Sequence, residues 1–508
     1  MRRAEQIELA LAPREDGVPL QRWLYDELRA AILTGRLLPG ARLPSSRDLA
    51  SRLALSRGTV LGVFSQLAAE GYLAGTVGRG SFVAPELPDR RINSNTRPSS
   101  PRSNTRAHVD GHQNGDVEDT SAHTIPLSSR GRLLSRSAFQ ITGRADAARA
   151  FRASQPDLDA FPFALWARLA AKRSRRTRRD LLCDGEAQGY RPLRESIAGY
   201  VGISRGIACT ADNVVVLGSV QQAIDLSARL LLDPGDAAWI EDPGYPGARL
   251  VLEAAGARVV GVPVDMGGMD IEWARQHAPD ARLVYVTAGR QAPLGPPLAL
   301  ERRLSLLEWA RDRDAIVIED DYDSEYRFEG NPLAALKSLD HYGHVIYCGT
   351  FSKLLFPGLR IAYAIVPDRL LDSFVAALSL TARHVPLDPQ SVLHEFIAEG
   401  HFGRHIRRMR LLYGERAEAL SSAVNRHLAG ALHVPRIVAG LDAPAFLAPG
   451  SDDTDVARRA ECAGIETRPL SRYAIERQAP PGLVLGFAAI DSDAVASGVI
   501  ALARVLCR

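Results

Sequence analysis

The sequence predicts a multidomain protein in which a small α+β unit precedes a much larger α/β unit. Three observations indicate this. Residues 20–67 carry apolar side chains at helical spacing, and two short strand patterns follow them. Residues 86–136 are rich in Ser, Asn, Asp, Arg, Pro and Gly and have almost no apolar periodicity. Further along, apolar runs of strand type appear, and one of them leads through a small-residue turn into an amphipathic helix, as in α/β folds.

Length and composition agree with this division and exclude several classes of protein. The chain has 508 residues, 46% of them apolar, and a formal net charge of +3 that is too small to indicate an acidic partner. Its five cysteines show no CxxC pair and no metal-ligand spacing, so we expect no disulfides and no metal site. Because it has no run of eighteen apolar residues and no signal-peptide pattern, we expect a cytoplasmic protein without membrane contacts.

The first unit, residues 1–85, is predicted to hold three helices and a hairpin. Gly35 ends the first helix, and Ser45 or Ser46 caps the second. The unit has 11 Arg and no Lys against 8 acidic residues, an excess that neither supports nor excludes nucleic-acid binding. The predicted elements are a helix over residues 20–33, a short helix within 43–50, a helix over 58–67, and strands at 72–74 and 81–83.

Residues 86–145 are predicted to be a flexible linker, because so polar a stretch cannot bury a core. A random coil of about fifty residues spans on the order of 40 Å, which gives the first unit a long reach from the second. A role as a partner-binding segment is the alternative. The second unit then covers residues 146–508.

Two features early in the second unit suit an anionic, planar ligand. A strand over residues 213–217 leads through Gly218, Ser219 and Val220 into a helix over 221–232, and amides at a helix N-terminus bind phosphate. The turn-rich loop of residues 241–247 carries Tyr245, which could stack on a planar ring. Ordinary loop packing is the alternative for this tyrosine.

An apolar strand over residues 315–318 runs directly into an acidic segment, residues 319–323. Asp320 and Tyr322 are two positions apart, so they point the same way from an extended chain. A solvated acidic loop is an equally weighted alternative.

Lys353 is one of only three lysines in the chain, and it follows a third strand pattern, residues 345–347. A lysine amine can lose its proton when it is buried and form a Schiff base with an aldehyde cofactor, whereas arginine stays protonated. Ligands bind outside the carboxyl ends of strands in open α/β sheets, so this position suits a cofactor. Seven residues on, Arg360 could hold a phosphate.

This ordered set of residues resembles the class I and II aminotransferases, which are fold-type I pyridoxal-phosphate enzymes, from about Phe151 to the C-terminus. The resemblance implies that Lys353 forms the Schiff base with pyridoxal 5'-phosphate, that Asp320 partners the pyridine nitrogen and that Tyr322 donates to the phenolic oxygen. It also implies that Tyr245 stacks on the ring. The implied phosphate-binding residues are Ser352, Arg360, Val220 and Gln221.

The first unit resembles the winged helix-turn-helix of GntR-type regulators. Residues 43–50 match Leu-Pro-Ser-x-Arg-x-Leu-Ala, residues 56–60 match the Ser-Arg-x-Thr-Val start of the recognition helix, and residues 78–83 match the wing. The resemblance implies binding to double-stranded promoter DNA, with the start of the recognition helix at base edges and phosphates. A solvated surface charge is the alternative for any single arginine. The implied DNA-binding residues are Arg47, Arg57, Thr59, Arg79 and Gly80.

A winged helix fused ahead of an aminotransferase-like unit resembles the MocR subfamily of bacterial regulators. The resemblance implies a homodimer in which the large unit is a sensor rather than an enzyme. Pyridoxal phosphate and/or an amine or amino-acid effector then acts through Lys353 and shifts DNA binding. An active aminotransferase with an accessory DNA-binding unit is the alternative, and a body that serves only as a scaffold is a third hypothesis.

Three departures from the family pattern stand out. The usual Ser-His-Gln-x-Pro-x-Gly segment appears here as Gly289-Arg290-Gln291-Ala292-Pro293-Leu294-Gly295, which puts contacts near the cofactor ring in doubt. The phosphate turn differs at residues 218–222. The C-terminal strand, residues 482–487, lacks the arginine that usually binds the substrate carboxylate, and Arg472 or Arg468 is the predicted substitute.

Overall fold

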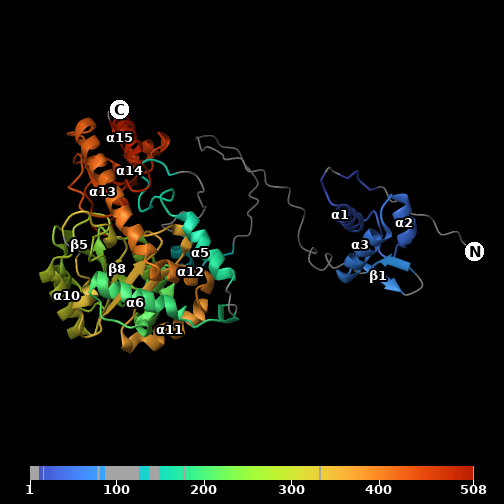
Figure 1. The fold of residues 1–508 in the computed structure, drawn as a ribbon, viewed down its shortest axis with the longest axis horizontal. Coiled ribbons are helices and arrows are strands. Elements are labelled where there is room, and N and C mark those ends of the chain that lie inside the picture. Colours follow the sequence, from blue (N-terminus) through green and yellow to red (C-terminus); the bar gives the residue numbers. More distant parts are fainter. Residues whose placement is uncertain are drawn as a thin grey trace, which may run out of the picture. The chain divides into compact units, whose positions relative to one another are not determined.

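The structure is a computed structural model, and it describes residues 11–14, 17–76, 80–85, 125–136, 148–175, 179–181, 183–330 and 333–506. The chain divides into two compact units, residues 1–120 and 121–508. Both are drawn in Figure 1.

The N-terminal unit has the predicted order of elements. Its second and third helices begin at serine caps: Ser45 accepts a hydrogen bond from the Asp48 N–H, and Ser56 accepts one from the Thr59 N–H. The helices and the hairpin enclose an apolar core that includes Leu28. The elements are α1 (Leu20–Leu33), α2 (Ser46–Arg52), α3 (Arg57–Ala69), β1 (Leu73–Thr76) and β2 (Gly80–Val83).

A mixed eight-stranded sheet forms the centre of the second unit, in the order β3-β10-β9-β8-β7-β4-β5-β6. Five neighbouring strands, from β9 to β5, run parallel, whereas β10 is antiparallel to both of its neighbours. The carboxyl ends of the parallel strands therefore meet at one edge. The bounds are β3 (Val214–Leu217), β4 (Ala237–Asp242), β5 (Arg258–Asp265), β6 (Gly268–Met269), β7 (Leu283–Val286), β8 (Ile316–Asp321), β9 (Val345–Thr350) and β10 (Ala362–Ile365).

Helices cover both faces of this sheet because successive strand residues point to opposite sides. In β9, Val345 and Tyr347 join the cores on one side, and Ile346 and Cys348 join the core on the other. The latter core includes residues of α7 (Val220–Leu231), α8 (Pro246–Ala255) and α11 (Asp368–Ala382). The opposite cores include residues of α6 (Arg191–Arg205), α9 (Ile271–His277), α10 (Leu300–Arg313), α12 (Leu387–Ala398) and α13 (His401–His427).

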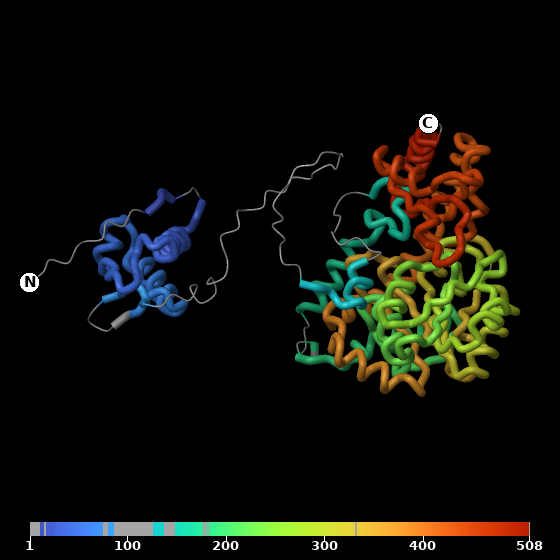
Figure 2. The backbone as a smooth tube through the Cα atoms, turned by 180° about the vertical axis from the view of Figure 1, so that it is seen from behind, coloured from blue at the N-terminus to red at the C-terminus, as the bar shows by residue number. Residues whose placement is uncertain are grey.

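The C-terminal part of the second unit carries a separate antiparallel sheet in the order β11-β12-β14-β13. Figure 2 shows this orange and red part gathered beyond the green and yellow sheet region, with the C-terminus at its end. Long helix α13 packs against α15 beside it. The bounds are β11 (Leu432–His433), β12 (Asp442–Leu447), α14 (Asp453–Cys462), β13 (Arg468–Pro469), β14 (Gly482–Gly486) and α15 (Ser492–Leu506).

One short helix, α4 (Ser129–Leu134), lies within residues 86–145, which were predicted to be a flexible linker. Ser128 caps it, and it contacts α8 of the body. A helix of this length is not stable alone, so the contact with α8 explains why apolar periodicity did not reveal it. Helix α5 (Phe163–Arg175) follows.

Candidate cofactor site and DNA-binding surface

The loops after three neighbouring parallel strands bring the main site residues together. Arg290 lies in the loop after β7, Tyr322 comes directly after β8, and Lys353 follows β9. The Lys353 Nζ lies 4.0 Å from the centroid of the Tyr322 ring. Lys353 is therefore at the edge of the sheet where ligands bind in open α/β folds.

The surroundings of Lys353 favour its neutral amine. Burial lowers the pKa of Lys353, although Asp323, Asp320 and Asp442 oppose the shift. A lowered pKa makes more of the unprotonated amine available, and this is the form that attacks an aldehyde.

Asp320 is a buried strand residue, so the alternative of a solvated acidic loop is wrong. Its side chain is 7% exposed and its Oδ2 accepts a hydrogen bond from the Tyr285 hydroxyl at 2.7 Å. The other oxygen, Oδ1, is buried and has no hydrogen-bond partner. Burial raises the pKa of Asp320, which a cationic N–H donor at Oδ1 would reverse. The orphaned oxygen thus fits the protonated nitrogen of a pyridine ring.

Arg290 holds Tyr322 in place. In the sequence, Arg290 stands out only as a departure from the family pattern. Arg290 Nη1 donates to the Tyr322 hydroxyl oxygen at 2.9 Å. The neighbouring Gly289 also departs from the family pattern, and a Cβ at this position would come within 2.4 Å of the Ser324 Oγ. Ser324 therefore takes the space that a serine at position 289 would need.

Tyr245 precedes α8, and its ring centroid is 6.2 Å from that of Tyr285, the residue that binds Asp320. Gly247 leaves room for it, since a Cβ there would lie 2.6 Å from the Tyr245 Cζ. Gln221 Nε2 donates to the Gly247 carbonyl at 2.6 Å and so joins the start of α7 to this loop.

The predicted phosphate-binding residues lie at a helix start and two turns. At α7, the Ser219 side chain accepts from the Gln222 N–H, and Gln222 Oε1 folds back to accept from the Gly218 N–H at 2.9 Å. Val220 and Gln221 begin the helix between these contacts. The altered turn therefore still forms a capped helix N-terminus, which attracts anions.

Ser352 and Arg360 complete that predicted set. The Ser352 N–H donates to Thr350 Oγ1 at 3.1 Å. Arg360 is exposed with φ 51°. Burial raises the pKa of Tyr245, and Arg360 is one of the charges that oppose this rise, so it lies within electrostatic reach of that ring.

The two predicted effector arginines differ in their surroundings. Arg468 of β13 lies directly opposite Val484 of β14, and paired residues of antiparallel strands project from the same face. It hydrogen bonds with Tyr473 and interacts electrostatically with Asp442 and Tyr245. Both arginines are exposed, and Arg472 lies in the following 3-10 turn. Arg468 thus lies on the strand that pairs with the strand lacking the family arginine, and its charge acts on site residues.

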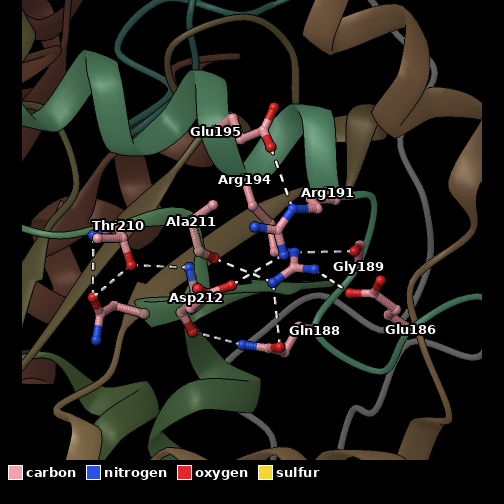
Figure 3. Close-up of polar contacts among 10 residues, drawn as sticks. Glu186, Gln188, Gly189, Arg191, Arg194, Glu195, Thr210, Ala211 and Asp212 are labelled. Atoms are coloured by element: carbon pink, nitrogen blue, oxygen red, sulfur yellow. Dashed lines mark hydrogen bonds and ion pairs between the residues drawn. The ribbon is translucent and has the colours of Figure 1, made fainter.

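The segment Gly-Tyr-Arg-Pro-Leu-Arg, residues 189–194, has a structural role that Figure 3 shows. Arg194 is fully buried, and it donates to the Gly189 and Ala211 carbonyls and to the Gln188 side chain, each at 3.2 Å. Glu186 pairs with the same guanidinium. These bonds fix the loop before α6 against the turn that leads into β3.

In the N-terminal unit, Arg47 and Arg57 are exposed near the starts of α2 and α3. Thr59 Oγ1 shares a 2.8 Å hydrogen bond with the Ser56 hydroxyl. Gly80 begins β2 with φ +101°, which favours glycine. The remaining predicted contact, Arg79, lies outside the described residues. Arg42 forms an isolated antiparallel β-bridge with Phe82 of this hairpin.

Comparisons with known proteins cover both units. Residues 154–425 match the aminotransferase class I and II family, and residues 20–83 match the gntR family of bacterial regulatory proteins. The chain is 39% identical to the probable rhizopine catabolism regulatory protein MocR of Rhizobium meliloti, over 96% of this chain and 94% of that protein. It is 32% identical to the HTH-type transcriptional regulator TauR of Rhodobacter capsulatus, over 98% of each.

The body also resembles solved aminotransferases. The α-aminoadipate aminotransferase LysN of Thermus thermophilus, complexed with N-(5'-phosphopyridoxyl)-L-leucine, gives a TM-score of 0.65 at 30% identity. The match covers 70% of this chain and 91% of that one. In the described part of the chain, no cluster of His, Cys, Asp and Glu could hold a metal ion, and no helix is long and apolar enough to span a bilayer.

Proposed function

Since this chain belongs to the MocR-type members of the GntR family of transcriptional regulators, we propose that it binds pyridoxal 5'-phosphate at Lys353 and that this site controls promoter binding by its winged helix. The observation that carries the cofactor proposal is the unpartnered Oδ1 of buried Asp320 beside a lysine whose pKa is lowered. A buried acceptor without a donor is costly unless a ligand completes it.

Each site residue has a defined task. Lys353 supplies the amine that attaches the cofactor, Asp320 keeps the ring nitrogen protonated, and Tyr322 donates to the phenolic oxygen. Tyr245 stacks on the ring. Bound in this way, pyridoxal phosphate supplies an electrophilic carbon that amines attack. The phosphate is held by Ser352, Arg360 and the amides of Val220 and Gln221.

Regulation follows from competition at that carbon. An effector amine that displaced Lys353 would free the lysine side chain, so the protein with effector would differ from the protein without it. Such a ligand shifts DNA binding only by its differential affinity for the two states. The regulator acts in the cytoplasm, where the promoter is, and binds as a homodimer.

Promoter binding should depend on cofactor loading. We expect the affinity for the promoter beside the protein's own gene to change by about 5- to 150-fold between the cofactor-free and loaded full-length protein, measured by fluorescence anisotropy. Arg57→Ala should weaken binding in both forms, because it removes a cation at the recognition helix.

Arg22→Ala is the matched control, since Arg22 lies on α1 and pairs with Asp26 at 3.4 Å on the surface of the same unit. Equal affinities of the two forms would contradict the sensor proposal. Steady turnover of an amino donor with 2-oxoglutarate would instead favour an aminotransferase with an accessory DNA-binding unit.

Arg468 is proposed to bind the anionic group of the effector. Arg468→Gln should weaken the spectral response to a carboxylate-bearing amine by about 10- to 150-fold, since a hydrogen bond to a charged group contributes about 1.5–3 kcal/mol. The response to the same amine without its carboxylate should stay unchanged. Arg472→Gln is the comparison, and a larger loss in that variant would assign the role to Arg472.

A further inference from the structure

Arg290 lies at the centre of a buried polar network in the cofactor site. It is 6% exposed, and it stands where the family pattern has a histidine. Besides the 2.9 Å bond to Tyr322, its Nη1 contacts Asp323 Oδ2 at 3.1 Å. Its Nη2 contacts Asp442 Oδ1 at 3.2 Å and also donates to the Asp442 carbonyl. One guanidinium thus joins the loops after β7 and β8 to strand β12.

The surrounding backbone is shaped around this guanidinium. Gly440 has φ +98°, and a Cβ at that position would lie 2.5 Å from the Arg290 Cζ. Asp442 is fixed from its other side, because its Oδ2 accepts from the Ser154 N–H at 3.0 Å and from the Ser154 hydroxyl at 2.9 Å. Arg290 therefore has one defined position.

The hydrogen-bond chemistry of arginine fixes the role of the Tyr322 hydroxyl. A guanidinium has five N–H donors and no acceptor, so Tyr322 must accept from Arg290. The single hydroxyl proton of Tyr322 then has to point elsewhere. Within the described ranges, no residue accepts it. A neutral histidine could present either a donor or an acceptor, and arginine removes that choice.

The charges around Tyr322 act on its pKa in opposite directions. Arg290 and Lys353 are the cations that face it, and Asp320, Asp323 and Asp442 are the carboxylates. Burial raises the pKa of Tyr322 well above its usual value, and Arg290 is the strongest opposing influence. Tyr322 thus stays a hydroxyl, and Arg290 makes it a better donor.

We propose that Arg290 is a positioning residue that aims the Tyr322 proton at the phenolic oxygen of the cofactor and thereby favours the deprotonated form of the lysine-bound cofactor. This inference rests on the proposed function, because it needs pyridoxal phosphate on Lys353. A hydrogen-bond donor stabilises the phenolic oxygen most strongly when that oxygen carries a full negative charge. Loss of the donor therefore raises the pH at which the bound cofactor loses its proton.

The test is a pH titration of the visible absorbance of the cofactor-loaded protein. Arg290→Gln should move the midpoint to higher pH by about one unit, and Tyr322→Phe should move it the same way. If Arg290 acts through Tyr322, the double variant should match Tyr322→Phe alone rather than the sum of the two shifts. Arg290→His, which restores the family residue, should give an intermediate midpoint and keeps the test open if Arg290→Gln fails to fold.

The outcomes separate this inference from the proposal beneath it. No visible band in the wild-type protein would overturn the cofactor proposal itself. A wild-type band whose midpoint is unchanged in both Arg290 variants would show that Arg290 is merely structural. Additive shifts would show that Arg290 acts by its charge alone and would overturn the role assigned through Tyr322.

Discussion

Lys353→Ala is expected to abolish covalent attachment of pyridoxal phosphate while the protein stays folded. Borohydride reduction of the loaded wild-type protein, followed by peptide mass mapping, should place the cofactor on Lys353 alone. The variant should carry no label. The reason is the amine itself: burial lowers the pKa of Lys353, and no other side-chain amine lies beside the orphaned oxygen of Asp320 in the described part of the chain.

The other two lysines provide matched controls. Lys172 Nζ pairs with Glu399 at 2.8 Å and with Glu395 at 3.0 Å, and hydrogen bonding to these carboxylates raises its pKa. Lys337 Nζ pairs with Asp340 at 2.9 Å. Lys172→Ala and Lys337→Ala should therefore keep full labelling at Lys353. Label on either of these lysines in the wild-type protein would contradict the assignment.

Among the substitutions proposed for this protein, Arg205→Met is expected to lower the free energy of unfolding most. Arg205 lies at the end of α6, and its guanidinium contacts Asp321 at 2.7 Å and Glu325 at 2.8 Å, with all three side chains 5% exposed. Removing the cation leaves two carboxylates buried and unpaired, which costs about 3–5 kcal/mol. Denaturant unfolding of the full chain should show this loss as a lower midpoint.

Arg191→Ala on the same helix is the control for that measurement. Its partners Glu195 at 3.3 Å and Asp212 at 3.1 Å are both exposed, so its loss should cost about 0–1 kcal/mol. Equal losses in the two variants would contradict the argument from burial.

The loss of unfolding free energy in Arg205→Met, relative to the wild-type protein, should shrink as the pH falls. Burial alone would raise the pKa of Asp321, but Arg205 holds it below its usual value, so this pair stabilises the wild-type protein above the ordinary carboxyl range. In the variant, the unpaired carboxylates take up protons more readily than in the unfolded chain. At low pH the variant therefore regains stability while the wild-type protein loses the ion pair. A deficit that is independent of pH would show that the charges are not its cause.

Sequence patterns located the elements well where local signals were strong. The helix over Leu20–Leu33 has the predicted bounds, and α7 begins one residue before its predicted start, because caps and periodicity act within a few residues. Strand β8 was predicted to end at Ile318, but it continues to Asp321. Its acidic residues are compatible with a strand only because Tyr285, Arg205 and backbone amides compensate for their burial.

The sequence by itself determined the two-unit organisation and the two strand ends that carry Asp320, Tyr322 and Lys353, since hydrophobic period and rare residue types are local properties. Only the tertiary structure decided which partners they meet. The hydrogen bonds join Tyr285 to Asp320 across 35 positions, Arg290 to Tyr322 across 32 and Arg290 to Asp442 across 152. No periodicity encodes such separations. The same holds for Arg468, which is placed opposite Val484 by strand pairing. Long-range pairing determines which charges are buried together, and burial sets their pKa values and their chemistry.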